Sequence, residues 1–291
     1  MSLRALVQSR VLLVVGTAVT VAVPVLTVPH LPSVSPWPMV LGLLPWIVGK
    51  YVLCPLRWRV LTPAAPDGQA SRGWFLRASA ESELLGLVTP GHVGADVWRF
   101  HRLTRAGWAR GDAVLSIGAD RTVGAIGLAA FVVFAASSLP SGMLLLAAGI
   151  GVTLLVAGLV LHRVRPDLLP RGPLPRPRAL LAGLLLAAAY QLTIAGLLLG
   201  AVDATGHTLS PLSLLGAFGA SQVAAVVPGP NGASPRDGAL VVALVALGLP
   251  WVAAAAAVTL KSVLAWLPAL ALGGLSLLLR RRQTRAVAVV A

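Results

Sequence analysis

Long apolar runs alternate with short polar loops along this 291-residue chain. Because a helix needs about 20 mostly apolar residues to cross a bilayer, six of these runs predict full transmembrane helices. The predicted spans are residues 11–29, 38–56, 113–137, 142–162, 179–201 and 251–279. The first run is long for a cleaved secretory signal, and prolines stand where a cleavage site would fall, so we expect a retained helix.

Two further apolar runs, residues 74–98 and 210–249, are interrupted by clusters of proline and glycine. The interrupting residues are Pro90, Gly91 and Gly94 in the first run and Pro228, Gly229 and Gly232 in the second. Proline removes a backbone donor and glycine relaxes the backbone, so each cluster should break a helix. Broken backbone at membrane depth survives only where protein or a water-filled cavity covers it. Both runs are therefore predicted to be re-entrant hairpins.

Composition and charge strengthen the membrane interpretation. Apolar residues make up 57% of the chain and charged residues 11%, against roughly a quarter charged in soluble domains. The net charge of +14 does not indicate a nucleic-acid partner, because nineteen of the 23 basic residues fall on one side of the predicted layout. The positive-inside rule then predicts a multi-pass cell-membrane protein with both termini in the cytoplasm. The lone Cys54 has no partner for a metal site, and we expect no cofactor.

The order of the predicted elements repeats. Residues 1–140 and residues 141–291 each give span, span, broken hairpin and span. Three crossings per half would make the second half inverted relative to the first, as in many secondary transporters. The fold class expected is thus an all-α polytopic membrane protein, with a single transmembrane domain over residues 1–291 built as an inverted repeat.

Several ionisable residues lie within or beside the apolar runs. They are the cations Lys50, Arg121, Arg236 and Lys261, and the acids Glu81, Glu83, Asp96, Asp120 and Asp237. A charge at the bilayer centre costs roughly 2.5–3.5 kcal/mol, so such residues usually face a cavity or a partner. Neighbours on a helix point about 100° apart, so Asp120-Arg121 and Arg236-Asp237 each need partners from other helices.

Alternatives remain for most of these charges. The two adjacent pairs are either functional or structural struts between broken helices, and Lys50 is expected to snorkel to the interface. Glu81 and Glu83 are candidate partners for Arg121 or Lys261. His92 and His101 are interpreted as polar loop residues, because no second His or Cys lies at metal-ligand spacing.

The chemistry that these residues favour is the binding of an anion. Arginine holds phosphate through a planar fork of donors, and helix ends at the breaks add partial positive charge. We expect Arg121, Arg236 and Lys261, with Arg99 after the first break, to bind an anionic headgroup. Glu81, Asp96, Asp120 and Asp237 would serve as their charge partners.

Three motifs resemble the lysylphosphatidylglycerol synthase transmembrane region, also called the flippase-like domain family. The first segment, Pro90-Gly91-His92-Val93-Gly94-Ala95-Asp96-Val97-Trp98-Arg99, is similar to the family's P-G-x-x-G-E-x-x-R. Asp120-Arg121-Thr122-Val123-Gly124 is similar to E-R-x-x-D, with Gly124 in place of the family's Asp. The stretch from Pro228 to Asp237 is similar to P-G-G-x-G-x-R-E. Lys261 stands where the family often has Arg.

The resemblance covers about residues 85–280 and implies a protein that translocates or handles lipids. The leading hypothesis is a transporter or flippase for an anionic phospholipid or a polyprenyl-phosphate-linked lipid. The alternative is a non-transporting partner that holds a lipid for a separately encoded membrane transferase. An enzyme is not expected, because no catalytic motif is present, and an ion channel or small-solute transporter is a further alternative.

Overall fold

The computed structural model describes residues 35–65, 70–87, 89, 93–134, 175–224 and 234–280, with six single residues between 145 and 164. These parts of the chain form helices joined by turns and loops, without a strand. The elements are α3 (Pro36–Val48), η2 (Gly49–Leu53), α4 (Cys54–Leu61), α5 (Arg72–Leu87), α6 (Val93–Arg105), α7 (Arg110–Phe134), α9 (Pro177–Asp203), α10 (Pro211–Val223), α11 (Pro235–Ala246), α12 (Trp251–Pro268) and η7 (Ala269–Gly273).

Within the described residues, four helical stretches are long and apolar enough to cross a membrane. They are Pro36–Leu61, Arg110–Ala130, Pro177–Asp203 and Trp251–Arg280, and they match four of the six predicted spans. The other two predicted spans, 11–29 and 142–162, fall outside the described residues apart from single positions. The first stretch extends five residues beyond the predicted end at residue 56, so it includes Arg57 and Arg59.

Close backbone contacts between these helices fix their directions. Gly42 in α3 lies against Gly200 in α9, and Gly49 lies against Thr193, so α3 and α9 run antiparallel. A Cβ atom at Gly42 would lie 2.5 Å from the carbonyl oxygen of Gly196. Glycine is therefore required for this approach, as is common where membrane helices pack closely.

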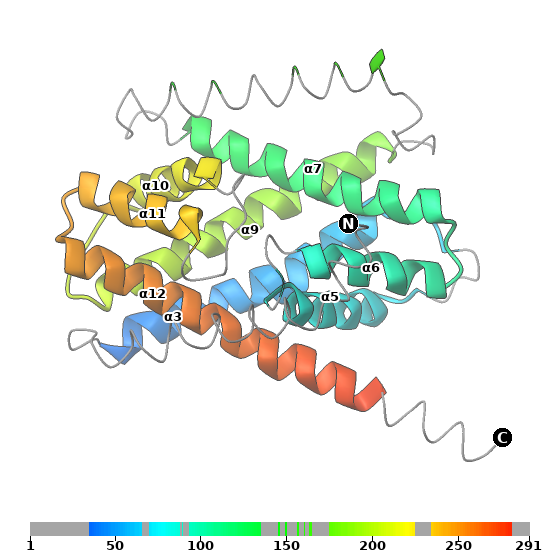
Figure 1. The fold of residues 1–291 in the computed structure, drawn as a ribbon, viewed down its shortest axis with the longest axis horizontal. Coiled ribbons are helices and arrows are strands. Elements are labelled where there is room, and N and C mark those ends of the chain that lie inside the picture. The colour runs from blue at the N-terminus through cyan, green and yellow to red at the C-terminus, as the bar shows by residue number, and fades with distance from the viewer. Residues whose placement is uncertain are drawn as a thin grey trace.

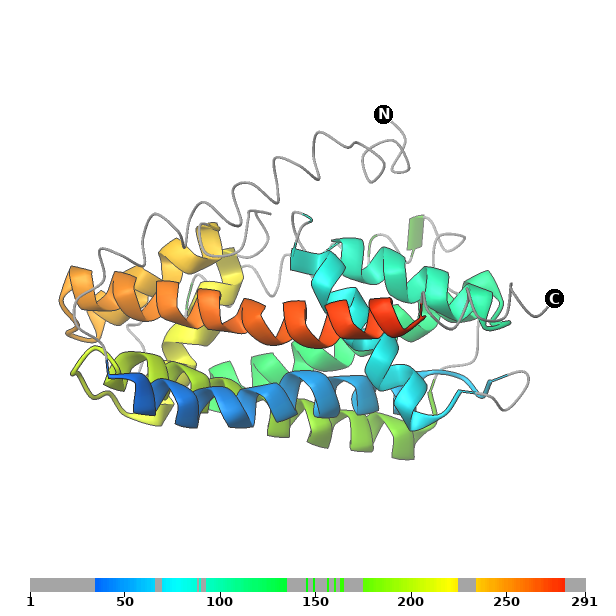
Figure 2. The ribbon, with the colours of Figure 1, turned by 90° about the horizontal axis from the view of Figure 1, so that it is seen from below.

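The two broken segments each form a pair of packed short helices. Helix α5 ends at Leu87 and α6 begins at Val93, while α10 ends at Val223 and α11 begins at Pro235. Figures 1 and 2 show α5 and α6 in one half of the bundle and α10 and α11 in the other half. The helix breaks thus lie where the sequence predicts them, although Pro90, Gly91 and Pro228–Gly232 themselves lie outside the described residues. The inverted repeat and the re-entrant path of the hairpins stay predictions.

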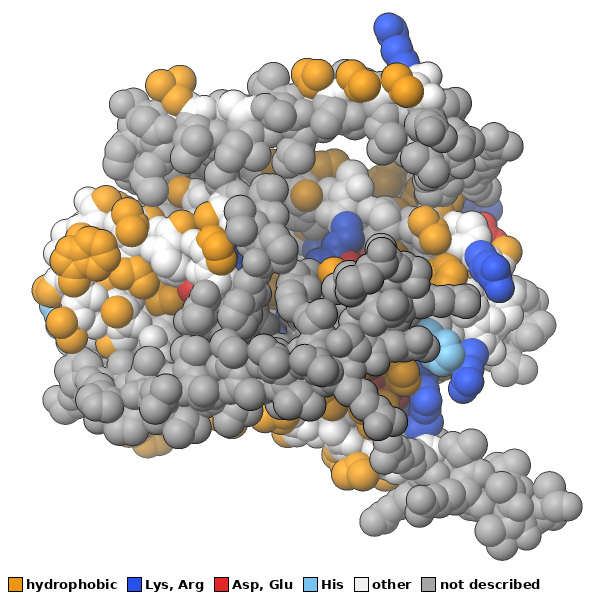
Figure 3. Space-filling view, viewed as in Figure 1, with side chains coloured by type: hydrophobic (Ala, Val, Ile, Leu, Met, Phe, Trp, Pro, Cys, Tyr) orange, Lys and Arg blue, Asp and Glu red, His pale blue; other side chains and the backbone are white. Residues whose placement is uncertain are grey.

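Basic residues gather at one end of the described bundle, here called the basic end. Helix termini at this end carry Arg59, Arg72, Arg105, Arg110, Arg176 and Arg280. Figure 3 shows basic side chains gathered at the end of the bundle where α6 lies. At the opposite end, turns 204–210 and 247–250 contain no Lys or Arg. This distribution is typical of the positive-inside rule.

A cluster of aromatic side chains packs at the basic end. Trp58 and Phe75 are buried, with ring centroids 5.0 Å apart, and Trp74 lies 5.6 Å from Trp108. The indole nitrogen of Trp58 donates to Ser116 at 2.9 Å, which ties α4 to α7. This cluster holds the first hairpin against the long helices and so positions the charges that it carries.

Candidate functional site

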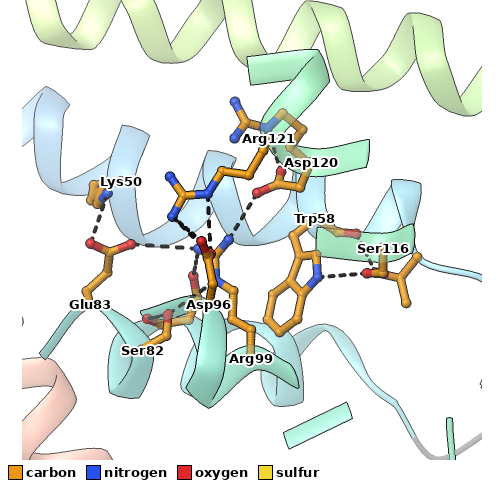
Figure 4. A network of polar contacts seen from close by, with 12 residues as sticks. Lys50, Trp58, Ser82, Glu83, Asp96, Arg99, Ser116, Asp120 and Arg121 are labelled. Atoms are coloured by element: carbon orange, nitrogen blue, oxygen red, sulfur yellow. Dashed lines mark hydrogen bonds and ion pairs between the residues drawn. The ribbon is translucent and has the colours of Figure 1, made fainter. Parts of the chain in front are cut away.

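Helix α7 places two opposite charges at its middle. Asp120 and Arg121 lie roughly 16 Å along the helix from its start at Arg110, in an apolar stretch. Asp120 is buried, whereas Arg121 is exposed. Figure 4 shows the two side chains leaving the same helix toward different partners.

Asp120 is the centre of a buried ion network. Its Oδ1 accepts a hydrogen bond from Arg57 Nε at 2.7 Å, and its Oδ2 accepts one from Arg99 Nη1 at 3.0 Å. Arg99 also donates to the hydroxyl groups of Ser79 and Ser82, each at 3.3 Å. Two guanidinium groups from two other helices therefore share one carboxylate.

The network continues through Glu83 to Lys50. Glu83 lies 3.7 Å from Arg99 and 2.9 Å from the ammonium group of Lys50, which belongs to the π-helical turn η2. Lys50 was expected to snorkel to the interface; its ammonium group instead lies against this buried carboxylate. The chain Lys50–Glu83–Arg99–Asp120–Arg57 thus links the first span, the first hairpin and α7 (Figure 4).

Arg57 was missed as a candidate, whereas Arg99 was predicted to bind the headgroup. Both are buried inside helices. Arg57 escaped because the predicted span stops at residue 56, where the sequence becomes basic, and only the true helix end at Leu61 reveals its position. A Cβ atom at Gly124 would lie 3.0 Å from Arg57 Nη1. Gly124 therefore faces this guanidinium.

Arg121 forms a different kind of ion pair. Its Nη2 lies 2.9 Å and 3.0 Å from the two oxygens of Asp96, and its Nε lies 3.3 Å from one of them. Asp96 is in the first turn of α6, where the helix dipole favours a negative charge. The Arg121 side chain is 51% exposed and that of Asp96 is 35% exposed. This pair is accessible from outside the packed core.

The predicted residues of the second hairpin form a separate group. Lys261 Nζ lies 3.1 Å from Asp237, which also accepts hydrogen bonds from the Ser234 hydroxyl and backbone nitrogen. Ser234 and Asp237 make a capping box at the start of α11. Arg236 has no ion pair with a described residue, and no described ion pair or hydrogen bond joins this group to Arg121.

Glu81 and Glu83 do not have the partners suggested for them. Glu81 is buried and accepts hydrogen bonds from Arg102 at 2.9 Å, Trp98 at 3.0 Å and Ser276 at 3.0 Å. These contacts tie α5 to α6 and to the helical stretch that ends at Arg280. Arg121 and Lys261 instead pair with Asp96 and Asp237, because each aspartate is nearer in space than either glutamate.

Among the described residues, no three His, Cys, Asp or Glu side chains cluster closely enough to bind a metal ion. His101 lies on α6 beside Trp98, and His92 lies outside the described residues. Burial lowers the pKa of His101, and the nearby Arg105, Arg280 and Arg102 lower it further, so its ring is neutral at neutral pH.

The fold and this site together define a polytopic helical membrane protein with ion-paired charges in its apolar interior. A family model described as the lysylphosphatidylglycerol synthase TM region matches residues 7–273. The chain belongs to that family, and a role in the membrane connected with lipids follows from this membership. Comparison with curated proteins and with solved structures gave no significant match.

Proposed function

We propose that this protein translocates an anionic lipid, either a phospholipid or a polyprenyl-phosphate-linked lipid. The observation that carries the proposal is the half-exposed Arg121, which lies in the middle of the apolar helix α7 and pairs with Asp96 at the start of α6. A guanidinium at this depth is expensive unless a cavity or a ligand receives it. Its Nε and Nη2 donate to the two oxygens of one carboxylate, and the same fork of donors fits two oxygens of a phosphate.

In this proposal Asp96 binds the guanidinium of Arg121 until a lipid headgroup displaces it. A phosphate that reaches Arg121 competes with Asp96 for the same donors, and the freed carboxylate then takes up a proton or a cation. Arg99 was expected to bind substrate directly. Because its guanidinium already contacts Asp120, Ser79 and Ser82 in the core, we assign it the role of a positioning residue.

The second hairpin and the helix that follows it would supply a second binding site for the headgroup. Arg236 lies at the start of α11, and Lys261 lies in α12, where it pairs with Asp237. If the two halves are inverted repeats, the two hairpins open toward opposite faces and expose the headgroup alternately. The acyl chains would remain in the bilayer, and the basic end would face the cytoplasm of a cell-membrane protein.

The family description names a synthase, and this favours a second candidate. In that candidate, the chain holds an anionic lipid for a separately encoded membrane transferase and does not translocate it. Neither candidate assigns catalysis to this chain.

The test is lipid translocation in proteoliposomes. We would compare the native chain with Arg121→Ala, using fluorescent phosphatidylglycerol and a polyprenyl phosphate, with and without a proton gradient. We expect the native chain to move at least one of these lipids and Arg121→Ala to lower the rate about tenfold, the effect of roughly 1.4 kcal/mol. The matched control is Arg110→Ala, which removes an exposed arginine from the first turn of the same helix.

Two results would overturn the proposal. Equal losses in Arg110→Ala and Arg121→Ala would show a general charge effect and no site at Arg121. A folded native chain that moves neither lipid would leave the lipid-holding candidate in its place.

A further inference from the structure

A second feature that the proposed function does not use is a groove at the basic end. It has a volume of about 760 Å³ and lies between η2, α5 and the end of the last helical stretch. This volume falls within the range of small-molecule sites in proteins. The groove is separate from the Arg121–Asp96 pair, since neither residue lines it.

One wall of the groove is apolar and open to the outside. Val48 and Val52 from the first span face Leu272, Leu275 and Leu279 from the last helical stretch. All five side chains are more than a third exposed. In a protein that spans the bilayer, such a wall lies against lipid chains. The two π-helical turns, η2 and η7, both contact α5 and widen the helices on either side of the groove.

The other wall carries more positive than negative charge. Arg77, Arg102 and Arg280 line it together with a single carboxylate, that of Glu81. Arg102 lies 2.9 Å from Glu81 and neutralises it, whereas Arg280 lies farther away, at 3.7 Å. Burial lowers the pKa of Arg102, and the charges of Arg280 and Arg77 act in the same direction, opposed by Glu81. The three guanidinium groups therefore lie close together on this wall of the groove.

The position of this wall matches that of lipid headgroups. The groove opens at the basic end, and Arg280 is followed in the sequence by Arg281, Arg282 and Arg285. Clusters of arginine next to a membrane helix attract anionic lipids. Trp74 and Trp98, whose rings lie under Arg102 and Arg280 at 5.2 Å and 5.1 Å, have the amphipathic character of interfacial aromatic residues.

We infer that this groove binds one anionic phospholipid, with its phosphate between Arg77 and Arg280 and an acyl chain along Val52 and Leu275. The apolar wall alone would accept any lipid, and the excess of cations selects an anionic headgroup. The inference goes beyond the proposed function because it requires binding and no translocation. The groove holds a lipid at the basic end, where it is available either for transfer to Arg121 or for presentation to a partner enzyme.

The test is lipid binding by native mass spectrometry of the purified full chain. We would titrate phosphatidylglycerol and phosphatidylcholine with identical acyl chains. We expect phosphatidylglycerol to bind more tightly, and the double variant Arg77→Gln/Arg280→Gln to weaken it by roughly tenfold to thirtyfold. The matched control is Arg72→Gln/Arg105→Gln, which removes two exposed arginines of the same end that do not line the groove.

A pair of leucine substitutions tests the apolar wall independently of charge. Leu275→Trp should fill the groove and lower the binding of phosphatidylglycerol, whereas Leu278→Trp should not. Both leucines are exposed on the same helix, and only Leu275 lines the groove. Equal effects of the two leucine variants, equal effects of the two arginine pairs, or equal affinity for the two lipids would overturn the inference.

The groove inference and the proposed function can be contradicted independently of each other. If the chain binds phosphatidylglycerol in the groove but translocates no lipid, the groove inference is supported and the proposed flippase function is contradicted.

Discussion

Asp120 and Arg121 are neighbours on one helix, yet their surroundings differ completely. Asp120 is buried and accepts hydrogen bonds from two arginines, whereas Arg121 is half exposed and pairs with the carboxylate of Asp96. The cause is helical geometry, because adjacent side chains point about 100° apart and so face different helices.

This difference distinguishes charges that join helices from charges that are accessible to a ligand. The network around Asp120 joins three parts of the molecule, and each of its guanidinium groups donates to at least one protein oxygen. Arg121 lies outside that network and its partner is itself accessible. The sequence left both alternatives, strut and site, open for the pair Asp120-Arg121. The contacts fit a strut at Asp120, and we propose the site at Arg121.

The largest effect is expected from Asp120→Asn. This substitution leaves the guanidinium groups of Arg57 and Arg99 in the core without their shared negative charge. Breaking a buried ion pair by removing one partner costs about 3–5 kcal/mol. The free energy of unfolding should fall by that amount, as measured by SDS titration in mixed micelles.

The control for this prediction is Asp112→Asn on the same helix. Asp112 lies in the first turn, so its loss should cost only the dipole interaction, about 0.3–1 kcal/mol. Similar losses for both variants would contradict the assignment of Asp120 as the centre of a structural network.

A smaller effect on stability is expected from the pair of Arg121 and Asp96. Exposed ion pairs contribute about 0.2–1 kcal/mol. A double-mutant cycle with Arg121→Ala and Asp96→Ala should give an unfolding coupling in that range. The same cycle on Arg57 and Asp120 should give a larger one. Comparable coupling energies would make Arg121 a strut, and the proposed headgroup site would lose its support.

The sequence predicted the helices better than the contacts between their charges. Spans at 38–56, 113–137, 179–201 and 251–279 were recognisable because the bilayer demands long apolar runs whatever their neighbours are. The helix breaks near Pro90 and Pro228 were recognisable for a local reason as well, since proline and glycine act on their own backbone.

Partners in the charge network depend on contacts that no local pattern contains. Glu81 accepts a hydrogen bond from Ser276, which is 195 residues away, and Arg57 reaches Asp120 across 63 residues. Hydropathy also placed Arg57 outside its helix, because the polar side chains that end an apolar run do not have to end the helix. Assigning Glu81 to Arg102 instead of Arg121 required the packing of α5 against α6.

The smallest expected effect concerns His101, which lies on α6 beside Trp98. Its pKa is lowered first by burial and then by Arg105, Arg280 and Arg102. Arg105→Gln removes one of these charges, so the pKa of His101 should rise toward its ordinary value, while Arg72→Gln should not move it. Because the unfolded chain protonates this ring more readily, stability should fall as the pH drops through the ordinary histidine range, and less so in Arg105→Gln.

Ring signals assigned by comparison with His101→Gln in an NMR titration would measure the shift in the pKa of His101. An unchanged pKa in Arg105→Gln would mean that solvent screens these arginines, and the basic end would then attract anions only through charges closer to the groove.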